Sequence, residues 1–435
     1  MKAFKSAGLK QSVLMILGNG VATGISALSL ILFSRVLGPE SFGIFSIGFS
    51  IMQLVVRLSD FGVNVAVQRS VAPEFETDEK KTRGLLAAGT RYKLIFSLVM
   101  VFIGLWLSPV IAGVWLKTEN IKIVKLGILL SVLTVWFEYI AVILQSMRKF
   151  VSSVVMSVAQ ALAKLAGAVW FFVGQISDAV LSFWVYGLAP LVGVVIGGVL
   201  VPKWAKWTVF EKPVYGPIKK VVKFTSISVI AAAIGDNIDV LMVKSFLTSY
   251  ETGLFAAGAR ISLLISIVAY SLGTVLSPRV ARYKTKEHFS SYLKKSILLI
   301  MVLLVTAIIV IPLAGPLVWL TAGPSYMEAT RVVAFLLVSG MVVVSTTPIV
   351  AMFYSLKNPE YFAYSGILQT VVLITANLIL IPMHGIEGAG MAKLIARVSV
   401  FVFSIWFAIK AMKKQFNIRL IDELASSRSV LGSDK

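Results

Sequence analysis

Long apolar stretches, separated by short polar or Pro- and Gly-containing breaks, run along almost the whole chain. A helix that crosses a membrane needs about 20 mostly apolar residues, and the stretches reach that length. The shortest break, Gly174–Asp178, divides the region 151–201 into two spans. The pattern predicts twelve spans, at about 12–34, 41–68, 86–113, 122–147, 151–175, 178–201, 217–247, 251–280, 290–313, 329–356, 360–381 and 388–411.

The composition supports an all-α polytopic membrane protein. Of the 435 residues, 58% are hydrophobic and 14% are charged, whereas soluble domains average about 45–50% and about 25%. The chain has no Cys and two His, His288 and His384, far apart in sequence. These counts exclude disulfides and Cys nucleophiles and leave little room for a His-based metal site.

The basic residues predict the orientation of the spans. The formal net charge is +21, and most of the 41 Lys and Arg fall in alternate breaks. Basic loops stay on the cytoplasmic side, so we expect cytoplasmic N- and C-termini in the plasma (inner) membrane. The charge then contacts lipid headgroups and not nucleic acid. This assignment counts Lys93 with the cytoplasmic ends and Lys393 with the outside ends.

An internal repeat divides the chain into two halves. A shift of 210 positions superposes one set of small and apolar residues on another near the start of each half. Weak symmetry of this kind is typical of transporters built from two related bundles. We therefore expect two six-helix lobes around a central cavity, 1–210 and 211–435, the second with a short cytoplasmic tail. The matched residues are Leu37, Gly43, Phe45, Gly48 and Ile51 with Leu247, Gly253, Phe255, Gly258 and Ile261.

Three segments resemble one family of transporters. They are SRVLGPESFGIFSIGFSIM (Ser34–Met52), DNIDVLMVKSFLTSYETGLFAAGARI (Asp236–Ile261) and NLILIPMHGIEGAGMAKLIAR (Asn377–Arg397). Together they resemble, in the same order and at the same spans, the polysaccharide transporters of the multidrug/oligosaccharidyl-lipid/polysaccharide exporter superfamily. The resemblance extends over nearly the whole chain.

That resemblance implies a flippase for lipid-linked oligosaccharides such as O-antigen units. Such a protein moves an isoprenoid-pyrophosphate-linked sugar across the membrane by alternating access, as two lobes rock around the cavity. The implied partners are the lipid-linked oligosaccharide, the bilayer and other proteins of polysaccharide assembly.

Several charged residues lie at span depth, where each is costly, about 2.5–3.5 kcal/mol on insertion scales. An Arg matches phosphate oxygens with its planar fork, and amides can bind sugar hydroxyls; Gln369 and Asn377 are further amides at this depth. As ligands of pyrophosphate and sugar we predict Arg57, Arg260, Arg397, Asn19, Asn64 and Asn237; as charge partners or ion-coupling groups we predict Asp60, Glu138, Lys164, Asp236 and Asp239.

The same residues have structural interpretations. Asp60 lies three positions after Arg57, on one helix face, and Asp239 and Arg260 lie at equal distances from the turn near Ser249. Each pair could be a structural ion pair, as could Glu138 with Lys164. Asp236 could instead carry a proton or Na⁺, Arg397 could be paired, and the amides could join helices.

Two other function classes stay open. A cation-coupled exporter of small amphipathic molecules predicts a cavity dominated by acids. An enzyme of polysaccharide assembly predicts a large outside loop, but the first one, Leu37–Glu40, is short. The chain has no phosphate-binding Gly-x-x-x-x-Gly-Lys loop and no HExxH or EF-hand pattern. We therefore expect no catalytic residues, no metal and no cofactor except a coupling Na⁺ or H⁺.

Overall fold

The computed structural model describes residues 7–206, 208–280, 283, 286–355 and 360–416. Within these ranges the regular elements are helices. Four short segments, Ile111–Trp115, Thr208–Phe210, Ile311–Leu313 and Pro324–Ala329, are π or 3₁₀ helices. The α-helices are α1 (Ala7–Asp60), α2 (Val63–Val71), α3 (Glu79–Val110), α4 (Ile121–Ser146), α5 (Phe150–Gly174), α6 (Ala179–Leu200), α7 (Lys203–Lys206), α8 (Tyr215–Phe246), α9 (Ser249–Val280), α10 (Lys286–Val310), α11 (Ala314–Thr321), α12 (Thr330–Ser355) and α13 (Glu360–Phe416).

Nine helices of the described chain are long and apolar enough to cross a membrane. Two of them, in α1 and α13, are hairpins that kink at Gly38 and Gly385, so each supplies two of the predicted spans. Both glycines have positive φ, 70° and 58°, a conformation that glycine adopts without steric cost. With α9, these helices account for the twelve predicted spans and confirm an all-α multi-pass membrane protein.

One predicted span ends differently in the structure. The apolar pattern predicts a helix over 41–68, but α1 ends at Asp60 and a new short helix, α2, begins at Val63. Phe61 and Gly62 between them have positive φ, 45° and 82°. The Asp60 carboxylate accepts hydrogen bonds from the backbone N–H of Gly62 (3.3 Å) and Asn64 (3.1 Å). An acid just before the break satisfies N–H groups at the start of α2, which are without helical partners.

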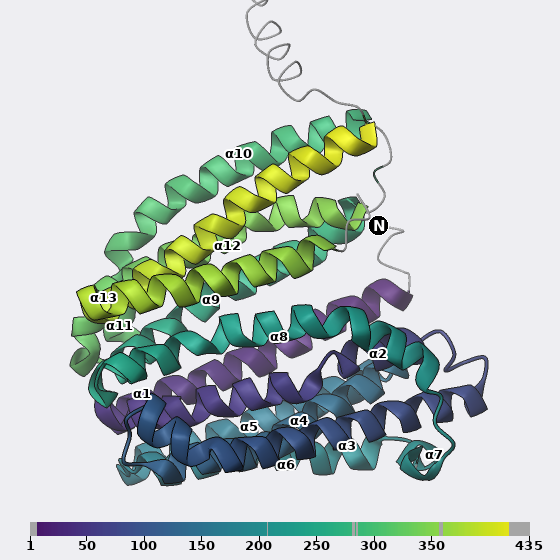
Figure 1. The fold of residues 1–435 in the computed structure, drawn as a ribbon, viewed down its shortest axis with the longest axis horizontal. Coiled ribbons are helices and arrows are strands. Elements are labelled where there is room, and N and C mark those ends of the chain that lie inside the picture. Colours follow the sequence, from purple (N-terminus) through teal and green to yellow (C-terminus); the bar gives the residue numbers. More distant parts are fainter. Residues whose placement is uncertain (1–6, 207, 281–282, 284–285, 356–359, 417–435) are drawn as a thin grey trace, which may run out of the picture.

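The helices form two sets that diverge from one end (Figure 1). The first set is α1–α6 and the second is α9–α13, while α8 contacts both. At the end with the two kinks, one apolar core joins the sets, with Phe42 and Phe45 of α1 beside Phe255 of α9 and Tyr326. At the other end each set has its own core, around Tyr139 in the first and residues such as Phe353 in the second.

We call these the closed end and the open end. The first described residues of α1 and the last of α13 lie at the open end, where the two groups of helices are farthest apart in Figure 1. The N-terminal half of α8 packs against α2 and α3 of the first set. The boundary between the two lobes, which the sequence predicts at 210/211, therefore stays a prediction. The two sets therefore share one apolar core at the closed end and have separate cores at the open end.

At the closed end, α1 and α9 cross in close contact, with one glycine of each helix at the crossing. A Cβ added to Gly43 of α1 would lie 3.0 Å from the backbone N of Gly253 in α9, and one added to Gly253 would lie 3.0 Å from the backbone N of Gly43. The two glycines are equivalent positions of the predicted repeat, 210 residues apart. Each contact mirrors the other, as a two-fold relation between the repeats requires.

Two further contacts tie the sets together at the closed end. The Tyr326 hydroxyl donates to the carbonyl oxygen of Ser34 at 2.8 Å. The Arg35 guanidinium donates to the carbonyl oxygens of Leu320 and Thr321 at the end of α11. Carbonyls at a helix C-terminus carry partial negative charge, so a cation is well placed there.

Candidate functional site

In the first set, Arg57 forms an ion pair with Glu138 of α4. Its Nη1 lies 3.3 Å from Glu138 Oε2, and the Arg57 side chain is 47% exposed. Arg57 is about 19 residues from the kink at Gly38, or roughly 28 Å along the helix. The pair therefore lies toward the open end. Its exposure makes it a weak stabiliser, but it neutralises both groups.

A second ion pair of the first set is buried. Lys93 of α3 places its Nζ 2.7 Å from Asp60 Oδ1, and both side chains are at most 9% exposed. The same ammonium donates to Asn64 Oδ1 at 3.1 Å and lies over the Tyr139 ring, 5.9 Å from its centre. Asp60 thus both caps α2 and neutralises Lys93. This cluster holds the break at Phe61–Gly62 in place.

Both span-depth acids of α8, the helix that contacts both sets, are paired with basic residues in the second half of α13. Lys393 Nζ donates to Asp239 Oδ2, and Asp239 is buried. Arg397 Nη2 lies 3.9 Å from Asp236 Oδ1, and Arg397 Nη1 donates to Gln369 Oε1 at 2.9 Å. Each of the four acids at span depth in the described chain therefore has a basic partner.

Two cations remain at span depth that form no ion pair within the described ranges. Lys164 of α5 lies over the Tyr186 ring, with its Nζ 4.6 Å from the ring centre. Arg260 of α9 lies over Phe49, with its Cζ 4.0 Å from the centre. The Phe49 and Tyr186 rings meet edge to face, 5.7 Å apart. The four residues form one group, which we call the cation–aromatic cluster.

The cation–aromatic cluster lies between the two sets near the closed end. At 1.5 Å per residue, all four residues lie about 10–16 Å from the helix ends there. Lys164, Phe49 and Tyr186 belong to the first set and Arg260 to the second. Arg260 Nε is buried without a hydrogen-bond partner among the described residues. A buried donor of this kind is unfavourable, and a bound anion would satisfy it.

The predicted pairings are wrong. Glu138 pairs with Arg57 and not with Lys164, and Asp239 pairs with Lys393 and not with Arg260. Arg57 does not pair with Asp60, because their helix directs one toward α4 and the other toward α3. Chain position gives the depth of a side chain, but the helix that faces it depends on lateral packing.

The predicted amide ligands have different surroundings. Asn64 belongs to the Lys93 cluster, and Asn237 Nδ2 donates to the carbonyl oxygen of Ala233 on its own helix at 3.0 Å. Asn19 lies partly exposed on the first half of α1. The structure shows no contact between these three residues and the cation–aromatic cluster. Their role as sugar ligands therefore stays a prediction.

Four residues of these groups were missed at the sequence level. Lys93 and Lys393 lie close enough to span ends to be counted as loop charges, yet both are inside the protein. Their positions offered a signal: Lys93 is seven residues and Lys393 five residues inside the predicted spans that begin at 86 and 388, so neither belongs to a loop. Phe49 and Tyr186 carry no signal among so many aromatic residues.

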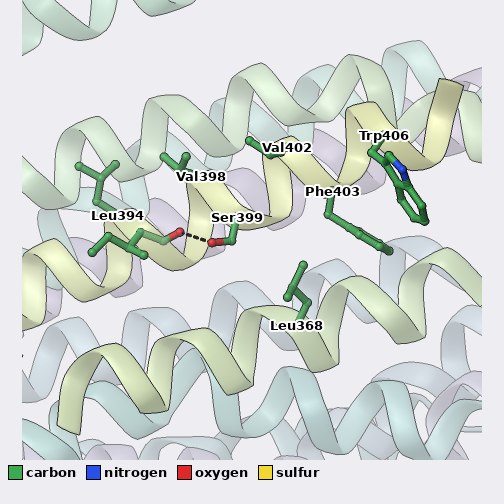
Figure 2. Close-up of a pocket in the computed structure, with 8 residues that line it drawn as sticks. Leu368, Leu394, Val398, Ser399, Val402, Phe403 and Trp406 are labelled. Carbon is green, nitrogen blue, oxygen red and sulfur yellow. Dashed lines mark hydrogen bonds between the residues drawn. The ribbon is translucent and has the colours of Figure 1, made fainter. Parts of the chain in front are cut away.

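An apolar groove of about 710 Å³ lies between the two halves of α13 (Figure 2). The hydroxyl of its one lining Ser, Ser399, donates to the carbonyl oxygen of Ile395 at 2.9 Å and is thereby satisfied. This groove offers no group to an anion, so it is separate from the cation–aromatic cluster. Its other lining residues are Leu368, Leu394, Val398, Val402, Phe403 and Trp406.

Comparison with protein families gives a match over residues 9–284 to the family described as polysaccharide biosynthesis protein. The match covers more than half of the chain. This protein belongs to that family. The family match confirms the resemblance drawn from the three sequence segments.

Individual relatives come from bacteria and archaea. The chain is 23% identical to the putative O-antigen transporter of Shigella flexneri, over 69% of this chain and 73% of that protein. It is 20% identical to the probable low-salt glycan biosynthesis flippase Agl15 of Haloferax volcanii, over 88% and 79%. It is 25% identical to the uncharacterized membrane protein MJ1375 of Methanocaldococcus jannaschii, over 93% and 98%.

Solved structures share the fold of this family member. An inward-facing multidrug resistance MATE family transporter of the MOP superfamily superposes with a TM-score of 0.72, at 15% identity over 92% of this chain and 99% of that one. The lipid II flippase MurJ, in an inward closed conformation, gives 0.69 at 12% identity over 93% and 90%. At these identities the likeness concerns the fold alone.

Proposed function

We propose that this protein is a flippase that carries an isoprenoid-pyrophosphate-linked oligosaccharide across the plasma membrane for surface polysaccharide assembly. It would be a transporter and not an enzyme, working by alternating access between its two sets of helices. The names of the Shigella and Haloferax relatives support the substrate class. The predicted cytoplasmic termini place the open end toward the cytoplasm, where such a substrate is made available.

The observation that carries the proposal is the charge balance at span depth. Arg57, Lys93, Lys393 and Arg397 each form an ion pair with an acid, while Lys164 and Arg260 form none among the described residues and lie over aromatic rings. A pyrophosphate that links a lipid to a sugar is dianionic at neutral pH. The two cations of the cluster, one from each set of helices, match that charge.

The aromatic pair fits the same ligand. Rings beneath a cation hold it by its charge without neutralising it, so the ammonium and guanidinium keep their attraction for phosphate oxygens. Phe49 and Tyr186 are both buried and therefore act by positioning Lys164 and Arg260.

The charge balance disfavours the alternative exporter of amphipathic cations. Such a cavity requires an acid free to attract the cation. Asp60, Glu138 and Asp239 each form an ion pair with Lys or Arg, and the exposed Asp236 lies 3.9 Å from Arg397. The MATE likeness concerns the fold, which both functions share.

The test is complementation of a strain that lacks the protein, with an impermeant probe to assign lipid-linked intermediates to one leaflet. We expect Arg260→Ala and Lys164→Ala to reduce export at least about tenfold, since a hydrogen bond to a charged group contributes about 1.5–3 kcal/mol. Intermediates should accumulate on the cytoplasmic face. Arg331→Ala, which alters a mostly exposed Arg, serves as the matched control.

Arg57→Ala should reduce export less than Arg260→Ala, because Glu138 already neutralises Arg57. Wild-type export by both cluster variants, with normal insertion, would refute the proposed site. A deletion that leaves the intermediates unchanged but alters resistance to cationic compounds would favour the exporter instead.

A further inference from the structure

A polar group on α8 and α13 lies near the cation–aromatic cluster, where Asp239 acts on the charge of Arg260, and concerns the energy source of transport. Asp239 of α8 is 1% exposed. Its Oδ2 accepts from Lys393 Nζ, and its Oδ1 accepts from the backbone N–H of Val240 at 2.9 Å. An isolated carboxylate in such surroundings is strongly unfavourable, so a cation at this position is a requirement of the fold.

Asn377, on the first half of α13, is the third member of this group. It is wholly buried, and neither its Oδ1 nor its Nδ2 has a hydrogen-bond partner in the part of the chain that the structure describes. Buried amides with both ends unsatisfied are rare. Asn377 therefore has unused capacity to bind a ligand.

Helix register places Asn377 at the level of Asp239. The Thr370 hydroxyl of α13 donates to the carbonyl oxygen of Ala231 in α8 at 2.8 Å. From that contact both helices run toward the closed end, and both reach Asn377 and Asp239 about 11–12 Å farther on, at 1.5 Å per residue. Lys393 lies as far after the Gly385 kink as Asn377 lies before it, so all three share one level.

A carboxylate and an amide oxygen in a dry site are ligands that hard cations prefer. We propose that Asp239 and Asn377 mark a monovalent-cation site in which the chain's own ammonium, Lys393, neutralises Asp239 and leaves the Asn377 oxygen unused. Because this cation is covalently attached, it cannot be exchanged across the membrane. The second set of helices therefore neutralises Asp239 without sodium, and transport takes no sodium through this site. The inference holds whichever substrate is carried.

The experiment removes the ammonium and asks whether sodium replaces it. The melting temperature of the purified full-length protein is measured at pH 8 in NaCl and in choline chloride of equal ionic strength. Wild type should melt at the same temperature in both salts. Lys393→Ala should melt lower in choline, and sodium should raise its melting temperature by roughly 2–4 °C in a saturable way.

Two matched variants identify the site. Asp239→Asn combined with Lys393→Ala should lose the response to sodium, because the carboxylate is gone. Lys164→Ala removes another span-depth Lys, one without an acid partner, and should show no response. If Lys393→Ala does not yield folded protein, Lys393→Gln, which keeps most of the length of the side chain but not its charge, takes its place.

Two results would overturn the proposal. One is a folded Lys393 variant whose melting temperature is the same in sodium and choline. The other is a wild-type protein that sodium stabilises and that loses this response in Asp239→Asn; this second measurement needs no Lys393 variant.

Discussion

Replacing Gly43 with Ala should open the closed end. A Cβ at Gly43 would lie 2.9 Å from the carbonyl carbon of Ser249 and 3.0 Å from the backbone N of Gly253. These are backbone atoms, which cannot rotate away, so α1 and α9 must move apart. Overpacking of this kind costs about 1–3 kcal/mol. The penalty applies only where the two helices cross, and each 1.4 kcal/mol changes an equilibrium about tenfold. We expect the population open at this end to rise about 5- to 140-fold.

The chain has no Cys, so the labelling of one introduced thiol measures the accessibility of that position without reaction at other residues. Ser46 is wholly buried and lies three residues from Gly43, on the same face of α1. In a Ser46→Cys protein, an impermeant maleimide added on the side of the closed end should react faster when Gly43→Ala is present. Gly24→Ala is the control, because a Cβ at Gly24 has no atom within 4 Å.

Equal labelling rates in Gly43→Ala and Gly24→Ala, with both proteins folded, would refute this reasoning. The repeat adds a second check. Gly253→Ala should act as Gly43→Ala does, because its Cβ would meet the backbone at Pro39 and Gly43 in the same way. A response from only one of the two would contradict the reciprocal crossing.

Three further predictions follow from single contacts. Lys93→Met should lower the free energy of unfolding by about 3–5 kcal/mol, since it leaves Asp60 buried and unpaired; thermal melts in detergent should show partial recovery when Asp60→Asn is added, and no recovery would contradict the pairing. Tyr326→Phe loses one hydrogen bond that holds the closed end, worth about 1 kcal/mol, and should raise thiol labelling roughly fivefold. Gly385→Ala should destabilise the protein by about 1–2 kcal/mol because of the positive φ; an unchanged melting temperature would mean that the kink relaxes.

The span pattern could be predicted from sequence because each helix has to be apolar over the thickness of a bilayer. The limits of the prediction lie where apolarity is uninformative. The run 41–68 stays apolar through Phe61 and Gly62, although the backbone turns there. The signal that could have located the break is Asp60 followed by Gly62, a capping acid next to a residue that tolerates positive φ.

The candidate site was predicted in its residue types but not in its partners. Counting residues from a turn gives depth, which is why Arg260 and Lys164 were found. It does not give rotation about the helix axis, and the partners of Asp60 and Asp239 come from α3 and α13, far away in sequence. Charges one or two turns inside a helix deserve the same scrutiny as those at its centre.

The two cations of the cluster belong to different sets of helices, and that division suggests how a bound anion is released. Lys164 lies on α5 and Arg260 on α9, and α9 crosses α1 at Gly43. A ligand that bound equally well in both conformations would shift nothing. When the crossing opens, α9 moves away from the first set, and the distance between the two cations must change. An anion held by both in the conformation seen here would then keep only one of its partners, so its affinity falls when the cavity faces the other side. We therefore expect the charge-conserving variants Lys164→Arg and Arg260→Lys to retain more export than either Ala variant, because each keeps one cation on each set of helices.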